Sequence, residues 1–174
     1  MPNWPWIERT FNFDFPASKF PDLLERVRGT PVRVEALVKG LSHNVLTRSP
    51  GSGWSIQENV GHLIDLGYLA LQRVGEILAG KDVLVAADMT NRKTHEANHN
   101  ARNMADLLTE LRSERAQLVS RLEQLDESDW SKSALHPRLH QPMRIVDIAH
   151  FDSEHDDYHL ARISELKRKF GKVR

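Results

Sequence analysis

Residues 55–80, SIQENVGHLIDLGYLALQRVGEILAG, decide the fold class that this sequence predicts. Ser55 and Glu58 have the S-x-x-E spacing of a capping box, in which the two side chains bind backbone N–H groups at a helix start. Apolar side chains then recur every three or four residues, at Val60, Leu63, Leu66, Ala70, Val74 and Ile77. Gly80 follows the last of them, as is common after a helix end. The stretch predicts one long amphipathic helix.

Three further segments have the same helical periodicity. Residues 104–125 carry a stripe of leucines, and residues 144–170 end in basic side chains, which the helix dipole favours at that end. Residues 21–46 read as one long first helix that is broken at Gly29-Thr30-Pro31, because proline begins helices but does not continue them. The sequence therefore predicts an all-α fold, a four-helix bundle in a single domain spanning 1–174.

The segments between these helices predict no regular structure. Residues 1–16 hold five aromatic side chains and three prolines, which favours an extended arm that packs onto the bundle. A long loop of about 20 residues separates the second and third helices. Residues 126–143 contain Pro137 and Pro142 and show no alternating strand pattern, so we expect a loop.

The composition excludes several classes of protein. The 24 basic and 24 acidic side chains cancel, so we expect neither a nucleic-acid nor a membrane partner. No apolar run approaches a membrane span, and the N-terminus lacks the pattern of a signal peptide, so we expect a cytoplasmic protein. The absence of cysteine excludes disulfides, thiolate metal sites and a thiol nucleophile within the chain.

Nine histidines are more than an average chain of this length carries. One pair with i, i+4 spacing, His136 and His140, lies in the proline-containing loop, and two such pairs lie elsewhere. The first of these two, in His95-Glu96-Ala97-Asn98-His99, matches the H-E-x-x-H helix of zinc proteases. Its surroundings, NRKTHEANHNARN, are almost wholly polar and offer no apolar face to hold a helix in the protein. We therefore reject the protease interpretation. The segment either lines or covers the mouth of the bundle, or it is a solvated loop.

The second pair, His155 and His159, is the better candidate for metal ligands. At about 100° per residue, both fall on the face of the fourth helix that carries Ile148, Phe151, Ile163 and Leu166. Imidazoles buried on such a face need partners. Asp152 and Asp156 are placed to accept a ring N–H and orient a ligand.

His62 lies at the edge of the apolar stripe on the second helix, four residues after Glu58. Together with His155 and His159 it would make a three-nitrogen site with open positions, the form that catalytic metal centres take. Alternatively, His62 is a satisfied core residue. Glu58 is our candidate catalytic residue, as a proton acceptor or a partner of His62. Its alternative role is only that of the capping box.

The motifs WSIQENVGHL, HPRLHQPMR and SEHDDYHLARI together resemble the DinB-like (DinB/YfiT) superfamily, over nearly the whole chain. This resemblance implies a four-helix bundle, often dimeric, whose three histidines bind a divalent metal. The pattern places the ligands at His62, His155 and His159. Tyr158 stands where the family often has a further histidine, and we expect it to face solvent or a subunit interface.

The resemblance implies a metal-dependent transferase or hydrolase that acts on a small molecule, since family members of known chemistry include thiol S-transferases and a mycothiol-dependent isomerase. With no cysteine in the chain, a thiol would have to come from a low-molecular-weight cosubstrate. We expect zinc or nickel as the metal, with iron, copper or manganese as alternatives. The alternative functions are a non-catalytic metal- or ligand-binding bundle and a dimerisation module.

Overall fold

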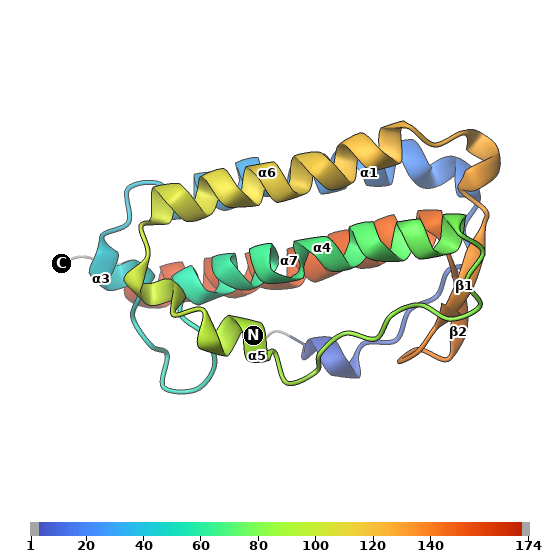
Figure 1. Cartoon of the computed structure of the whole chain (residues 1–174). Coiled ribbons are helices and arrows are strands. Elements are labelled where there is room, and N and C mark those ends of the chain that lie inside the picture. The colour runs from blue at the N-terminus through green and yellow to red at the C-terminus, as the bar shows by residue number, and fades with distance from the viewer. Residues whose placement is uncertain (1–3, 172–174) are drawn as a thin grey trace.

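The computed structural model describes residues 4–171 and has five principal helices. These are α1 (Phe20–Arg28), α2 (Thr30–Val38), α4 (Ile56–Leu78), α6 (Met104–Glu123) and α7 (Ile145–Phe170). Because α1 and α2 follow one another across Gly29, they serve as one long helix, and the predicted break is confirmed. The four-helix bundle is therefore confirmed (Figure 1).

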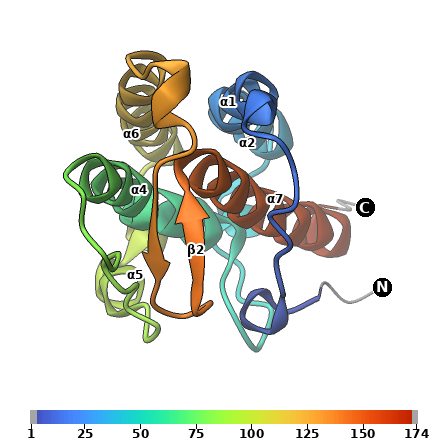
Figure 2. The same cartoon turned by 90° about the vertical axis from the view of Figure 1, so that its right-hand side faces the viewer.

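Short elements connect these helices. Two are helices, α3 (His43–Leu46) and α5 (Arg92–Glu96), and four are 3-10 turns, at Trp6–Glu8, Ala17–Lys19, His99–Ala101 and Glu127–Asp129. The helices lie in two layers, with α1, α2 and α6 on one side and α4 and α7 on the other (Figure 2). The N-terminal arm, α5 and a β-hairpin lie against α4 and α7 on the side away from α6 (Figures 1 and 2).

The expectation of a loop at 126–143 is wrong in part. Strands β1 (Ser133–His136) and β2 (Gln141–Arg144) form an antiparallel pair, with Ala134 opposite Met143. Each strand has only four residues, too few for an alternating pattern to stand out in the sequence. Pro142 excluded a helix, as predicted, but an edge strand tolerates proline because its outer N–H needs no partner.

The N-terminal arm packs its aromatic side chains onto α7, as predicted for its described part; residues 1–3 lie outside the described residues. The ring centroids of Trp6 and Phe11 lie 4.9 and 4.8 Å from the ring centroid of Phe151. The ring of Phe15 lies 5.2 Å from that of His150. These contacts fix the arm along the half of α7 that follows the hairpin.

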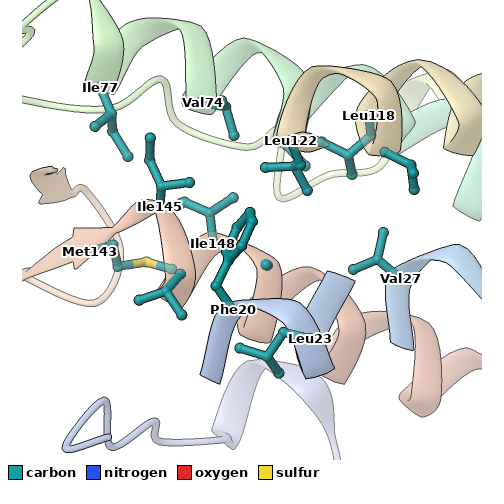
Figure 3. Close-up of a cluster of buried hydrophobic side chains, with 14 of the residues drawn as sticks. Phe20, Leu23, Val27, Val74, Ile77, Leu118, Leu122, Met143, Ile145 and Ile148 are labelled. Carbon is teal, nitrogen blue, oxygen red and sulfur yellow. The ribbon is translucent and has the colours of Figure 1, made fainter. Parts of the chain in front are cut away.

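The apolar core has two parts. One joins α1, the second half of α4, the second half of α6, the hairpin and the start of α7, and Figure 3 shows Phe20 of α1 close to Ile148 of α7. The other joins α2 and α3 to the first halves of α4 and α6 and the end of α7, around residues such as Leu63 and Ile163.

A buried polar layer separates the two apolar parts. Arg115 of α6 is 4% exposed, and its guanidinium donates to the carboxylates of Asp152 and Asp156 on α7. Thr30, at the start of α2, donates to Asp156 over 2.6 Å. Buried charges are stable only when paired in this way, so this layer sets the register of α2, α6 and α7. The histidines of α4 and α7 lie at the same level of the bundle. Within residues 4–171, no helix has the length and apolarity that crossing a bilayer requires.

Candidate metal centre

His62, His155 and His159 meet between α4 and α7. One ring nitrogen of each lies within 4.8 Å of those of the other two, and Nε2 of His155 is 3.2 Å from Nε2 of His159. His62 and His159 are each 3% exposed, and His155 is half-buried. The structure therefore brings together the three residues that the sequence singled out, and they could hold a metal ion.

The tautomer of His159 follows from its neighbour Asn59. Nδ2 of Asn59 donates to the backbone oxygens of Ser55 (2.7 Å) and Trp54 (3.3 Å), so the amide oxygen must point the other way. That oxygen lies 2.8 Å from Nδ1 of His159 and can only accept. Nδ1 therefore carries the proton, and the lone pair of Nε2 faces the other two histidines.

His62 is oriented in the same manner by a second chain of hydrogen bonds. Its Nδ1 lies 3.0 Å from Oγ1 of Thr94, and Thr94 in turn hydrogen-bonds to Asp65. Since the hydroxyl proton goes to the carboxylate, Nδ1 of His62 must be the donor to Oγ1, which leaves its Nε2 unprotonated. Asp65 also accepts from Nε2 of His99, over 2.8 Å. Burial raises the pKa of Asp65, but hydrogen bonds from His99 and Thr94 outweigh it and bring the pKa below its usual value.

Burial keeps all three histidines neutral at physiological pH. It lowers the pKa of His62 and of His155 to about 3, and it lowers the pKa of His159 well below its usual value. Charge repulsion among the rings lowers the pKa values of His62 and His159 further. A neutral imidazole is the form that binds a metal, so the site is already in its ligating state.

Aromatic rings and two pockets surround the three histidines. Trp54 lies 4.4 Å from His62, and Trp6 of the N-terminal arm lies 5.0 Å from His155, measured between ring centroids. His155 lines a pocket of about 230 Å³, and His159 lines a second pocket of about 190 Å³ on the other side. The centre is thus walled by rings and open to small molecules.

The expectation for Asp152 and Asp156 needs correction. They do not bind the histidine rings, because Arg115 holds both carboxylates in the polar layer. Tyr158 is half-buried, with its ring edge-on to His159 at 5.0 Å and beside the Arg9 guanidinium, and its place at solvent or a subunit interface stays a prediction.

The capping box of α4 is formed. Oε2 of Glu58 accepts from the backbone N–H of Ser55 over 2.8 Å, and Oγ of Ser55 accepts from the N–H of Glu58 over 3.1 Å. The capping role that was the alternative for Glu58 is therefore present. Its catalytic role stays a prediction.

The HEANH segment is not a metal-binding helix, in agreement with the rejected protease interpretation. Helix α5 ends at Glu96, and Asn98 has a left-handed conformation (φ 47°), so His95 and His99 do not share one helix. His95 is exposed, whereas His99 is 2% exposed against α4. Neither side chain belongs to the described histidine cluster. Thr94, directly before this segment, hydrogen-bonds to His62, so the polar loop reaches the centre at that residue.

Asn59 and Thr94 are the site residues that the sequence analysis missed. Asn59 precedes His62 by three residues on the same helix, so its polar side chain on a largely apolar face was a usable signal. Thr94 lies 32 residues from His62 in a polar loop, and no spacing rule could connect the two.

Comparison with known proteins agrees with this architecture. The family model of the DinB superfamily matches residues 26–163. Among solved structures, YfiT from Bacillus subtilis, described as a probable metal-dependent hydrolase with an unusual four-helix bundle topology, has a TM-score of 0.81 at 16% identity, covering 95% of each chain. The colibactin self-resistance protein ClbS, solved in complex with double-stranded DNA, has a TM-score of 0.67 at 14% identity, covering 86% of this chain and 95% of its own.

A protein from Streptococcus pneumoniae has a TM-score of 0.64 at 12% identity, covering 95% of this chain and 93% of its own. No curated protein matches the sequence. At these identities the structural matches establish the fold alone. The family match covers most of the chain, from the end of α1 to the middle of α7. The chain belongs to the DinB superfamily.

Proposed function

We propose that this protein is a metal-dependent enzyme, a hydrolase or transferase, that holds one divalent cation on His62, His155 and His159 and acts on a small molecule. The observation that carries the proposal is the convergence of three imidazoles, two of them buried and with their protons fixed on the far nitrogen. The Nε2 lone pairs of His62 and His159 are then free to bind a cation.

The protein's own groups would orient the ligands and exclude water. Asn59 and Thr94 hold the rings of His159 and His62 in their ligating tautomers, the role that outer partners of metal-bound histidines usually have. Trp54 covers the His62 side of the centre. When bound, a divalent cation at such a site supplies a Lewis acid that activates water or a small thiol near neutral pH. Zinc or nickel suits three imidazole nitrogens, with iron, copper or manganese as alternatives.

Two reactions fit the site. Hydrolysis needs only water, and the description of YfiT as a probable metal-dependent hydrolase favours it. Thiol transfer needs a low-molecular-weight thiol, because the chain has no cysteine. Glu58 stays the candidate proton acceptor, with its carboxylate engaged in the capping box until substrate binds. A non-catalytic metal-binding bundle is the alternative, and a homodimer is the expected assembly.

The partners stay predictions as well. A small molecule is the substrate that the pocket beside His155 would accept. The neutral net charge argues against nucleic acid, but ClbS was solved with double-stranded DNA. Electrophoretic mobility shift with duplex DNA at low salt tests this directly, and a shift that persists at physiological salt would overturn the expectation.

Metal analysis of the purified protein tests the site. We expect about one divalent cation per chain in the wild type and none in His62→Ala or His159→Ala, because two imidazoles compete poorly with chelators. His95→Ala is the matched control, since His95 is an exposed histidine near the same centre, and it should keep the metal. Equal metal content in His159→Ala and the wild type would refute the assignment.

Activity separates the reactions. Panels of esters, amides and epoxides, with and without added thiols, should give turnover in the metal-loaded wild type and none in His155→Ala. In a cobalt-substituted protein, a thiol cosubstrate would change the absorption spectrum. Metal binding with no turnover on any panel would favour the non-catalytic bundle.

A further inference from the structure

The pocket beside His155 has an apolar wall and a separate polar end. It lies between α4, α7, the hairpin and the segment that follows α4, with a volume of about 230 Å³. Its apolar wall includes Trp6, Leu66, Ala70, Met89, Ile148 and Phe151. Its polar end carries Arg73, His136, Arg138 and Asp152. None of these four side chains is a candidate metal ligand.

His136 presents a buried N–H group that has no acceptor. Its Nδ1 accepts from the backbone N–H groups of Arg138 and Leu139, each over 3.2 Å, so its proton must be on Nε2. The residue is 2% exposed, and no described group lies within hydrogen-bond distance of Nε2. A buried donor without a partner is unfavourable, and a ligand oxygen would satisfy it.

Arg138 adds a cation that forms no ion pair with a carboxylate of residues 4–171. Its guanidinium lies over the rings of Trp6 and Phe151, at 5.9 and 5.7 Å, and one amino group donates weakly to the backbone oxygen of Ile7 (3.4 Å). The other, Nη2, is buried and has no partner among residues 4–171. Burial lowers the pKa of Arg138.

Arg73 is the second cation at this end. It is 4% exposed, and its Nε and Nη2 both donate to the backbone oxygen of Val85, at 3.2 and 3.0 Å. Burial lowers the pKa of Arg73 to about 10, although Asp152 and Glu76 oppose the shift. Asp152 is the carboxylate in the lining, and the Arg115 guanidinium already holds it. The polar end therefore offers N–H donors and positive charge in excess of acceptors.

We infer that this pocket binds a small molecule with an apolar body and one carboxylate, which accepts from Nε2 of His136 and the guanidinium of Arg138. The apolar body would lie along Phe151 and Ile148, with its far part beside His155. A carboxylate fits better than a phosphate, because a dianion loses more hydration in a pocket whose wall is mostly apolar. Binding of this molecule needs no metal. Only its role as the substrate rests on the proposed function.

Titration calorimetry with 3-phenylpropionate tests the inference. We expect saturable binding, at least tenfold tighter than that of the neutral 3-phenylpropanol and of 2-phenylethylphosphonate. Running the titrations on His62→Ala as well as on the wild type excludes binding of the carboxylate to a metal. If the alcohol binds as tightly as the carboxylate, or no probe binds, the inference is wrong. A tighter phosphonate would overturn the choice of carboxylate.

Two variants assign the binding to named groups. In His136→Asn the amide oxygen can replace Nδ1 as acceptor for the two backbone N–H groups, while the Nε2 donor is lost. Arg138→Gln removes the charge at a half-buried position. Each should weaken 3-phenylpropionate binding at least tenfold and leave 3-phenylpropanol unchanged. Arg112→Gln, an exposed arginine on α6, is the control and should bind as the wild type does.

If either variant binds 3-phenylpropionate as tightly as the wild type does, the assignment of the carboxylate to these donors is wrong. Circular dichroism checks that each variant is folded. Failure here is distinct from failure of the proposed function. A protein without metal that binds 3-phenylpropionate would refute the metal enzyme but not the pocket. A metal-loaded protein that binds no carboxylate would refute the proposed pocket ligand but not the metal enzyme.

Discussion

Oδ1 of Asn59 accepts a hydrogen bond from Nδ1 of His159 over 2.8 Å, and this contact joins the first turn of α4 to the middle of α7. Asn59→Leu removes the group that fixes the ligating tautomer. We expect metal affinity to fall about 10–100-fold, as for other outer partners of ligating histidines. Competition with a chromophoric chelator measures this. Asn44→Leu, at an exposed position of α3, should retain wild-type affinity. Wild-type affinity in Asn59→Leu would show that the contact does not orient the ligand.

Two glycines of α4 should respond in opposite ways to alanine. A Cβ on Gly61 would overlap the His99 ring, whereas one on Gly75 meets nothing within 4 Å. Gly61→Ala should displace the 94–99 segment and destabilise the fold by about 1–3 kcal/mol. Gly75→Ala should stabilise the helix by about 0.4–1 kcal/mol, because alanine restricts the unfolded chain. Urea unfolding measures both. Equal effects of the two substitutions would contradict the close packing of His99 on α4.

The polar layer should dominate stability among the charged residues. Arg115→Met leaves the carboxylates of Asp152 and Asp156 buried without their cation, and we expect a loss of about 3–5 kcal/mol. Arg112→Met breaks an exposed pair with Glu35 and should cost no more than about 1 kcal/mol. Guanidinium denaturation of both variants makes the comparison. If Arg115→Met were as stable as Arg112→Met, the layer would not hold the helices together.

Mild acid should destabilise the metal-free protein. The folded pKa is about 3 for His62 and His155 and about 4 for His136, below the unfolded value of about 6.5. Between these pKa values the unfolded chain binds more protons than the folded protein. The free energy of unfolding is therefore highest above pH 6.5 and falls as the pH drops towards 3. Burial raises the pKa of Asp156 to about 7, so this one carboxyl group stabilises the folded protein as the pH falls. The three histidines act in the opposite direction and outnumber it.

Urea unfolding at pH 7.5 and pH 5.5 in the presence of EDTA measures this difference. We expect a lower midpoint at pH 5.5, and His155→Gln should reduce the difference because one titrating group is gone. A midpoint that is equal or higher at pH 5.5 would mean that the histidines are not held neutral in the folded protein.

Removing the metal should weaken the fold without unfolding it. A cation bound only by the folded state adds its binding free energy to stability. The two apolar parts of the core, however, do not depend on the three histidines. EDTA should therefore lower the melting temperature and leave the helical circular dichroism spectrum at 25 °C intact. A random-coil spectrum after chelation would contradict this.

The sequence by itself determined the helices and the three candidate metal ligands. Helical periodicity and the capping box at Ser55 are local properties, so the limits of α4 could be read directly. The pair His155 and His159 was visible because residues four apart share one helix face. His62 could be added since it lies at the edge of the apolar stripe of α4, and the family motif includes it.

Only the tertiary structure decided which groups support that site. Asp152 lies one turn from His155 in the sequence, but Arg115 from another helix takes its carboxylate, because a buried guanidinium needs an anion more than a neutral imidazole does. Thr94 reaches His62 from a polar loop 32 residues away. The unpaired donors of His136 and Arg138 depend on how the hairpin packs against α7 and the N-terminal arm. Such partnerships arise from chain segments that meet only in the fold, and no local periodicity encodes them.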